Sequence, residues 1–281
     1  MTTLRQAIQR AAAQLADHSP SPRLDAEALL AHVLGVSRAY LLAESQRELT
    51  DAQEAAFQPL VARRSALEPI AYLTGHKEFY GLDFVVDRRV LVPRPETELL
   101  VDLALSWAAR RAQGPDLTIA DIGTGSGCIA VTLAHTLPES RVFAVDLSAD
   151  ALDVARINVQ RHGVTDRVAL LHGAGCDPLP QPVTLIVSNP PYTVLSAIDE
   201  NVRRWEPHLA LDGGGAQGFD LPAQLLRQIP RYLATHGAVL MELGAWQGDL
   251  ARQAAAAIFA AARITLHQDL AGHDRVLMIE T

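Results

Sequence analysis

The amino-acid sequence predicts an α/β protein in which a small helical bundle precedes a mostly parallel sheet with helices on its faces. Two observations lead to this prediction. Apolar residues recur at helical spacing from Thr3 to about Ala66, and they indicate several short helices. From about Leu117 onward, short runs of aliphatic residues alternate with helical stretches, which is the pattern of an open parallel sheet.

The N-terminal segment carries start and stop signals for these short helices. Thr3 can open the first helix through a capping box with the glutamine three residues later. A second helix is expected to begin at Ser21 and to end near Gly35. Ser37 and Thr50 then suit the N-cap position before two further apolar stretches. We therefore predict a small helical bundle.

The chain is expected to divide into three parts. Residues 1–75 form an N-terminal helical domain in this interpretation. Residues 76–93 form a β-hairpin linker, because aromatic and β-branched residues there surround turn signals at Gly81 and at Asp87. Residues 94–281 form the sheet domain, which begins with a leucine-rich helix.

Seven strands are predicted in the sheet domain. They are Leu117–Ile122, Arg141–Asp146, Val168–Leu171, Thr184–Ser188, Ala238–Leu243, Arg263–His267 and Val276–Glu280. A turn signal at Gly272 separates the last two strands, so we expect them to form an antiparallel pair at one edge of the sheet. Their order within the sheet does not follow from the sequence.

Composition and charge narrow the classes of function. A formal net charge of −8 argues against nucleic acid as the main partner, since duplex binding draws on a basic surface. Cys128 and Cys176 stand apart without a ligand pattern, so we expect neither a disulfide nor a metal site. The sequence shows no secretion signal and no long apolar run, and we expect a cytoplasmic protein without membrane contact.

A glycine-rich turn follows the first predicted strand of the sheet, where α/β proteins bind ligands. Its residues are Gly123, Thr124, Gly125, Ser126 and Gly127. A dinucleotide fingerprint would need glycine at Cys128, so the pattern disfavours NAD. Asp146 ends the next strand and can accept hydrogen bonds from both ribose hydroxyls, which S-adenosylmethionine offers without a pyrophosphate. The alternative is a plain strand-to-helix turn with Asp146 as a helix cap.

A second motif follows the fourth predicted strand and is made of Asn189, Pro190, Pro191 and Tyr192. The nitrogen of an amide or aromatic amine is a poor nucleophile, so its methylation needs positioning more than a strong base. The Asn189 side-chain oxygen and the Pro190 carbonyl can accept hydrogen bonds from the target NH2, and Tyr192 can pack over a planar target. A rigid turn without chemistry is the alternative. No G-x-S-x-G motif supports a hydrolase.

With these residues in view, the chain resembles the HemK/PrmC family, the protein-(glutamine-N5) methyltransferases of class I peptide chain release factors. Besides Asn189–Tyr192, the resemblance rests on the Glu-Phe-Tyr-Gly segment Glu78–Gly81 and the Pro-Arg-Pro-Glu-Thr-Glu segment Pro93–Glu98. It implies a Rossmann-like methyltransferase sheet, with the N-terminal domain recognising the substrate and a hairpin linker between them.

The resemblance also implies roles for single residues. Gly123–Gly127 and Asp146 would hold S-adenosylmethionine, which leaves as S-adenosylhomocysteine, and Asn189 would lie close to the transferred methyl. Asn189–Tyr192 would bind the glutamine of the release factor's Gly-Gly-Gln motif. The family usually has aspartate at the position of Ala174, so this chain is expected to contact adenine differently and to bind the cofactor more weakly. Alternatives are glutamine methylation of a ribosomal protein, adenine-N6 methylation of DNA, or a cofactor-binding protein without turnover.

Overall fold

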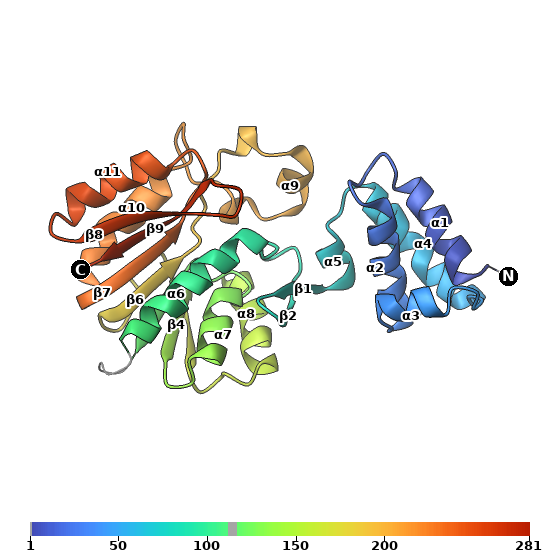
Figure 1. Ribbon diagram of the computed structural model, residues 1–281, viewed down its shortest axis with the longest axis horizontal. Coiled ribbons are helices and arrows are strands. Elements are labelled where there is room, and N and C mark those ends of the chain that lie inside the picture. Colours follow the sequence, from blue (N-terminus) through green and yellow to red (C-terminus); the bar gives the residue numbers. More distant parts are fainter. Residues whose placement is uncertain (1, 112–116) are drawn as a thin grey trace. The chain divides into compact units, whose positions relative to one another are not determined.

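The computed structural model describes residues 2–111 and 117–281 of the chain. These residues form two compact units, of which one ends at His76 and the other runs from Lys77 to Thr281 (Figure 1). Each unit has its own buried apolar core. The predicted α/β class with an N-terminal helical part is confirmed.

The N-terminal unit is a bundle of five helices. They are α1 (Leu4–Gln14), α2 (Pro22–Leu34), α3 (Arg38–Ala43), α4 (Asp51–Ser65) and α5 (Ile70–Thr74). The predicted caps at Thr3, Ser37 and Thr50 all accept a backbone N–H bond through their side chains. Helix α2 begins after Ser21 and ends before Gly35, as predicted, although the Ser21 side chain makes no capping hydrogen bond. Short α5 was not predicted, because five residues carry too little periodic signal.

The second unit opens with a β-hairpin of β1 (His76–Phe79) and β2 (Leu82–Val85). Tyr80 and Gly81 both have positive φ angles, of 53° and 75°, as a two-residue hairpin turn requires. Strand structure ends at Val85, so the expected continuation of the hairpin to Val92 is wrong. The Val92 N–H donates to the Glu206 carboxylate at 3.0 Å and not to a neighbouring strand.

The large sheet has seven strands in the order β5-β4-β3-β6-β7-β9-β8. They are β3 (Thr118–Ile122), β4 (Arg141–Asp146), β5 (Val168–His172), β6 (Val183–Ser188), β7 (Leu233–Glu242), β8 (Arg263–Gln268) and β9 (Asp274–Glu280). Strands β3 to β7 run parallel, and β9 pairs antiparallel with both β7 and β8. The predicted antiparallel C-terminal edge is thus confirmed. Parallel order places the carboxyl ends of β3, β4, β5 and β6 along one edge.

Helices pack on both faces of this sheet (Figure 1). They are α6 (Glu98–Arg110), α7 (Cys128–Thr136), α8 (Ala149–Arg161), α10 (Asp220–Gln228) and α11 (Gly248–Ile258). Short helix α9 (Glu200–Trp205) lies in the connection between β6 and α10. Short 3-10 turns are η1 (Pro95–Thr97), η2 (Leu195–Ala197), η3 (His208–Ala210) and η4 (Ile229–Arg231). Helices α10 and α11 cover a core that includes Ile122, Ile186 and Leu277. The residues that the structure describes include no helix long and apolar enough to span a membrane.

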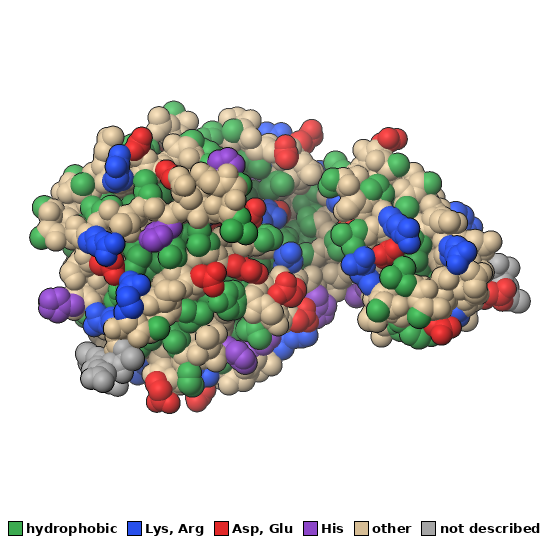
Figure 2. Space-filling model, viewed as in Figure 1, with side chains coloured by type: hydrophobic (Ala, Val, Ile, Leu, Met, Phe, Trp, Pro, Cys, Tyr) green, Lys and Arg blue, Asp and Glu red, His purple; other side chains and the backbone are tan. Residues whose placement is uncertain are grey.

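Charged side chains of both signs are interspersed on the face drawn in Figure 2. On that face the blue side chains do not gather into one extended basic area. Such a surface differs from the continuous basic face that duplex binding usually requires.

Candidate active site

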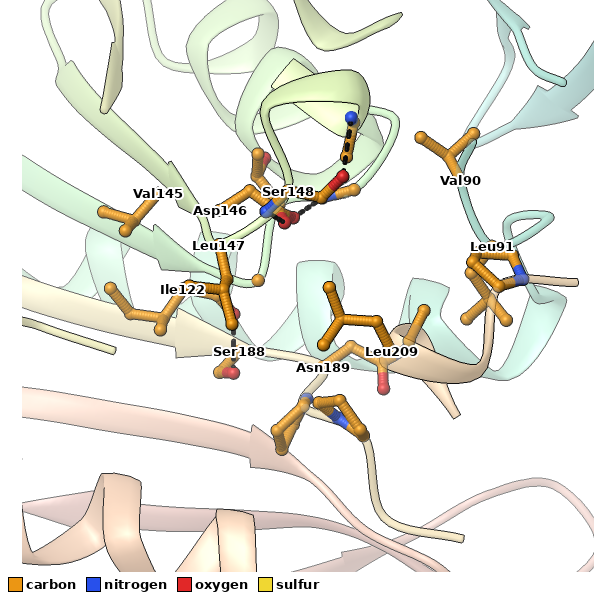
Figure 3. A pocket seen from close by; sticks show the side chains of 18 of the residues that line it. Val90, Leu91, Ile122, Val145, Asp146, Leu147, Ser148, Ser188, Asn189 and Leu209 are labelled. Carbon is orange, nitrogen blue, oxygen red and sulfur yellow. Dashed lines mark hydrogen bonds between the residues drawn. The ribbon is translucent and has the colours of Figure 1, made fainter. Parts of the chain in front are cut away.

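A cavity of about 460 Å³ opens at the carboxyl ends of β3, β4, β5 and β6 (Figure 3). This is where ligands bind in open α/β sheets. Its walls include both predicted motifs together with residues of the linker segment, the loop after β5 and helix α10. The principal lining residues are Val90, Leu91, Arg94, Thr97, Gly123–Ser126, Asp146, Leu147, Gly173–Gly175, Asn189–Pro191, Leu209, Gln224 and Gln228.

The glycine-rich loop lines the cavity with its backbone. Gly123, Gly125 and Gly127 all have positive φ angles, of 77°, 55° and 81°, so a side chain at these positions would strain the loop. At Gly127 an added Cβ would lie 3.3 Å from the Ala155 Cβ on α8, so glycine also permits close helix packing. The loop therefore lets a ligand approach its backbone closely, while the N–H groups of Gly123, Thr124 and Gly127 donate to backbone carbonyls within the protein.

Asp146 lies at the end of β4 with its carboxylate held in place from two sides. Its Oδ1 accepts the Ser148 N–H and its Oδ2 accepts the Gly125 N–H, each at 2.8 Å (Figure 3). Burial raises the pKa of this carboxyl, and the backbone bonds lower it. The carboxylate thus orients the glycine loop and also presents its remaining lone pairs to the cavity.

Asp121 is the penultimate residue of β3, just before the loop, and is fully buried. Its Oδ2 accepts the Thr124 hydroxyl at 2.6 Å and the Ala130 N–H at 3.1 Å, while Oδ1 has no partner among the described residues. Burial raises its pKa to about 7. In the sequence this position stands out only as an acidic residue before the glycines. A carboxylate near the end of an apolar strand also indicates a buried polar group that needs hydrogen-bond partners.

The Asn-Pro-Pro segment follows β6 directly and lines the cavity. Asn189 donates its side-chain NH2 to the Thr97 hydroxyl oxygen at 3.1 Å, so its Oδ1 is left as an acceptor. Tyr192 is not among the residues that line this cavity. Its hydroxyl donates to Glu242 Oε1 at 3.0 Å, behind the two prolines. The sequence did not identify Thr97 and Glu242 as partners of this segment, because only the folded chain brings Thr97 to Asn189 and Glu242 to Tyr192.

The segment after the hairpin forms one wall of the cavity, with Val90 and Leu91 facing it in Figure 3. Arg94 in this wall forms an ion pair of 2.5 Å with the buried Glu206.

Asn158 on α8 forms hydrogen bonds with the backbone of both the hairpin and the glycine loop. It accepts the Val85 N–H at 2.8 Å and donates to the carbonyls of Val85 and Ser126 at 2.9 and 2.8 Å.

The loop after β5 forms the far end of the cavity. Gly173, Ala174 and Gly175 line it, and Gln228 of α10 accepts the Cys176 N–H there at 3.0 Å. Asp177, which follows this loop in the sequence, is exposed and is not part of the cavity lining. The polar groups at this end are therefore glutamine amides and backbone atoms.

Two families match this chain. Residues 6–75 match the family described as PrmC N-terminal domain, and residues 101–205 match the Methyltransferase small domain. Among solved structures, a methyltransferase from Pyrococcus furiosus has a TM-score of 0.53 at 18% identity, covering 79% of this chain and 96% of that chain. A 16S rRNA N2 G1207 methyltransferase from T. thermophilus, solved with AdoMet and guanosine, has a TM-score of 0.52 at 15% identity, covering 73% of this chain and 49% of that chain. At these identities the likeness shows the Rossmann-like fold alone.

Curated relatives are much more similar and extend over both units. A release factor glutamine methyltransferase from Rhodopirellula baltica is 42% identical over 93% of this chain and 90% of its own length. One from Moorella thermoacetica is 41% identical over 98% of both chains. One from Koribacter versatilis is 44% identical over 86% of both chains. At such identity and coverage the chain belongs to the release factor glutamine methyltransferase family.

Proposed function

We propose that this protein transfers a methyl group from S-adenosylmethionine to the side-chain amide nitrogen, N5, of the glutamine in the Gly-Gly-Gln motif of class I peptide chain release factors. The observation that carries the proposal is the combination of full-length family membership with an intact Asn189-Pro190-Pro191 segment in the cavity wall. On this proposal the protein works in the cytoplasm, where translation terminates.

The cavity suits S-adenosylmethionine in its chemistry. Asp146 offers a fixed carboxylate for the two ribose hydroxyls, and the glycine loop lets the ligand approach the backbone closely. When bound, the cofactor supplies an electrophilic methyl on a sulfonium, and S-adenosylhomocysteine is the product. Gly123–Gly127, Asp146 and Asn189 are the residues that we assign to this ligand.

The Asn-Pro-Pro segment positions the amide in this proposal. Asn189 Oδ1 is free to accept one N–H of the glutamine NH2, because its own NH2 is committed to Thr97. The Pro190 carbonyl accepts the other N–H, and the prolines hold both acceptors rigidly. The nitrogen lone pair then points at the methyl carbon. The N–C bond forms as the S–C bond breaks, and the product amide loses one proton to water.

The substrate glutamine reaches the cavity on an extended loop. Tyr192 is assigned to the substrate site with Asn189, Pro190 and Pro191, and it acts by holding the segment from behind through its bond to Glu242. We assign release factor recognition to the N-terminal helical domain, residues 1–75, which matches a family of its own. The formal net charge of −8 gives no support to DNA as the substrate.

Labelled S-adenosylmethionine, purified protein and a release factor test the proposal together. Transfer is expected to the native factor, and not to a factor whose Gly-Gly-Gln glutamine is changed to alanine. An Asn189→Ala enzyme should bind S-adenosylhomocysteine and lose transfer. Transfer to a ribosomal protein or to DNA, with none to the release factor, would reject the substrate assignment and keep the fold and cofactor site.

A further inference from the structure

The loop after β5 begins beside the carboxylate that we assign to the ribose. Strands β4 and β5 are parallel, and Asp146 pairs with His172. The next residue, Gly173, donates its N–H to the Asp146 carbonyl at 3.0 Å. Gly173–Gly175 then line the cavity. We therefore expect the base of a nucleoside whose ribose is bound at Asp146 to lie against this loop.

This end of the cavity offers apolar side chains to the faces of a base. Leu147 follows Asp146, and Leu221 lies in the first turn of α10; they are 52% and 39% exposed, and both line the cavity. Figure 3 shows Leu147 in the cavity wall beside Asp146. Ala174 has no polar atom in its side chain, so it cannot recognise the edge of a base by a side-chain hydrogen bond. The polar side chains at this end belong to α10.

Gln228 is held at this end of the cavity by its carbonyl oxygen. It is the last residue of α10, it is half-buried, and it lines the cavity. Its Oε1 accepts the Cys176 N–H at 3.0 Å. A backbone N–H only donates, so the amide oxygen must face Cys176 and the NH2 must point away from that N–H. The amide also lies against Gly175, where an added Cβ would be 3.0 Å from the Gln228 Cδ. The orientation of this amide is thus fixed before a ligand binds.

The NH2 group of Gln228 makes no hydrogen bond within residues 2–111 and 117–281. It is therefore left to donate to a ligand in the cavity that Gln228 lines. Gln224 lies one turn earlier on the same helix and lines the cavity too, but it is exposed, and no hydrogen bond in the described part of the chain fixes its amide. An oriented amide loses less rotamer freedom on binding than a free one. Gln228 is thus the better placed of the two to recognise a base.

We propose that Gln228 donates an N–H to ring nitrogen N1 of adenine and thereby selects the base of S-adenosylmethionine. The adenine edge away from the ribose carries the acceptor N1 and the 6-amino donor, whereas N3 and N7 flank the bond to the ribose. Gln228 is anchored at Cys176, which lies farther along the loop than Gly173, the residue in contact with Asp146. Its NH2 therefore meets the outer edge, where N1 is the acceptor. The inference rests on the proposed function and adds which residue recognises the base.

Three variants of the full-length protein test the inference. Gln228→Glu keeps an oxygen for the Cys176 N–H and replaces only the free NH2, by an oxygen that repels the N1 lone pair. Gln228→Leu removes both ends of the amide. Gln224→Leu is the matched control, because it makes the same change one turn earlier at the same cavity. Each protein is titrated by calorimetry with S-adenosylhomocysteine, with its 1-deaza analogue, in which C–H replaces N1, and with its 7-deaza analogue.

Wild type is expected to bind the 1-deaza analogue about five- to tenfold more weakly than S-adenosylhomocysteine, and the 7-deaza analogue within about twofold, because one neutral hydrogen bond is lost only in the first case. Gln228→Glu and Gln228→Leu should bind S-adenosylhomocysteine more weakly by about the same factor, and neither should distinguish it from the 1-deaza analogue. Gln224→Leu should keep both the affinity and the preference.

Equal wild-type binding of S-adenosylhomocysteine and the 1-deaza analogue overturns the inference, and so does a preference that persists in Gln228→Leu. Thermal unfolding without ligand tests for a purely structural role. Gln228→Glu keeps the bond to Cys176, so its Tm should stay near that of wild type while its affinity falls; wild-type affinity in this variant overturns the inference. These measurements use no release factor, so they decide the inference even if the proposed substrate proves wrong, and transfer to the factor tests the proposed function separately.

Discussion

Replacing Asn158 with alanine is expected to loosen the cavity wall from the glycine loop. This side chain is fully buried on α8, and its amide uses one acceptor and both donor hydrogens. One N–H reaches the Ser126 carbonyl in the glycine loop, and the rest of the amide holds Val85 at the end of the hairpin. The truncation therefore removes three hydrogen bonds at once and leaves three buried backbone groups without them.

The magnitude follows from the number of bonds. A typical hydrogen bond contributes about 1 kcal/mol net, so three of them amount to about 3 kcal/mol of unfolding free energy. For a unit of this size, each kcal/mol corresponds to a change of about 2–4 °C in Tm, so the expected loss is about 6–12 °C. Cofactor affinity should fall as well, because Ser126 and the wall beyond Val85 border the same cavity.

Thermal unfolding measured with and without S-adenosylhomocysteine tests this prediction, since ligand binding identifies the transition of the second unit. Gln160→Ala is the matched control, because Gln160 is an exposed residue of the same helix. We expect the control to change Tm by less than about 2 °C. If Asn158→Ala changes Tm by as little as the control does and binds the ligand normally, the Asn158 amide does not hold the cavity wall to the glycine loop.

Three further outcomes follow from the structure. Gly175→Ala should weaken S-adenosylhomocysteine binding by calorimetry, because the added Cβ would lie 2.1 Å from Gln228 Oε1 and displace that amide from the cavity wall. Burial raises the pKa of Asp121 to about 7, so the wild-type unfolding free energy, relative to that of Asp121→Asn, should fall by up to about 4 kcal/mol in urea titrations as pH rises from about 4 to about 7. Thr50→Ala should cost the N-terminal unit about 1 kcal/mol through loss of the capping box with Gln53, and S-adenosylhomocysteine affinity should not change.

Local patterns predicted those elements whose signals lie within a few residues. The capping box at Thr3 needed only a residue and its partner three positions on, and the N-cap at Thr50 needed only a residue type before an apolar stretch. Strands such as β4 and β6 were predicted with their ends nearly correct, because continuous aliphatic runs are typical of strands buried on both faces. The C-terminal pair β8 and β9 followed from two such runs and a glycine turn.

Prediction was weakest where backbone groups find partners far along the chain. The segment after Val85 has β-branched residues and was expected to continue the hairpin, yet Val92 bonds to Glu206, which lies far away in sequence. Asn158 also carried a local signal, since it is a polar residue at a buried position of α8. Its partners Val85 and Ser126 could not be read from that signal, because they are set by how the hairpin meets the sheet.

The sequence by itself determined the α/β class, the glycine loop, the strand-end Asp146 and the Asn189-Pro190-Pro191 segment, because side-chain periodicity and turn chemistry are local properties of the chain. Only the tertiary structure decided the strand order, which places β4, β3 and β6 side by side and so joins the two motifs in one cavity. It also decided the orientation of Asn189. That orientation depends on the hydrogen bond from the Asn189 NH2 to Thr97, a residue that lies far away in sequence.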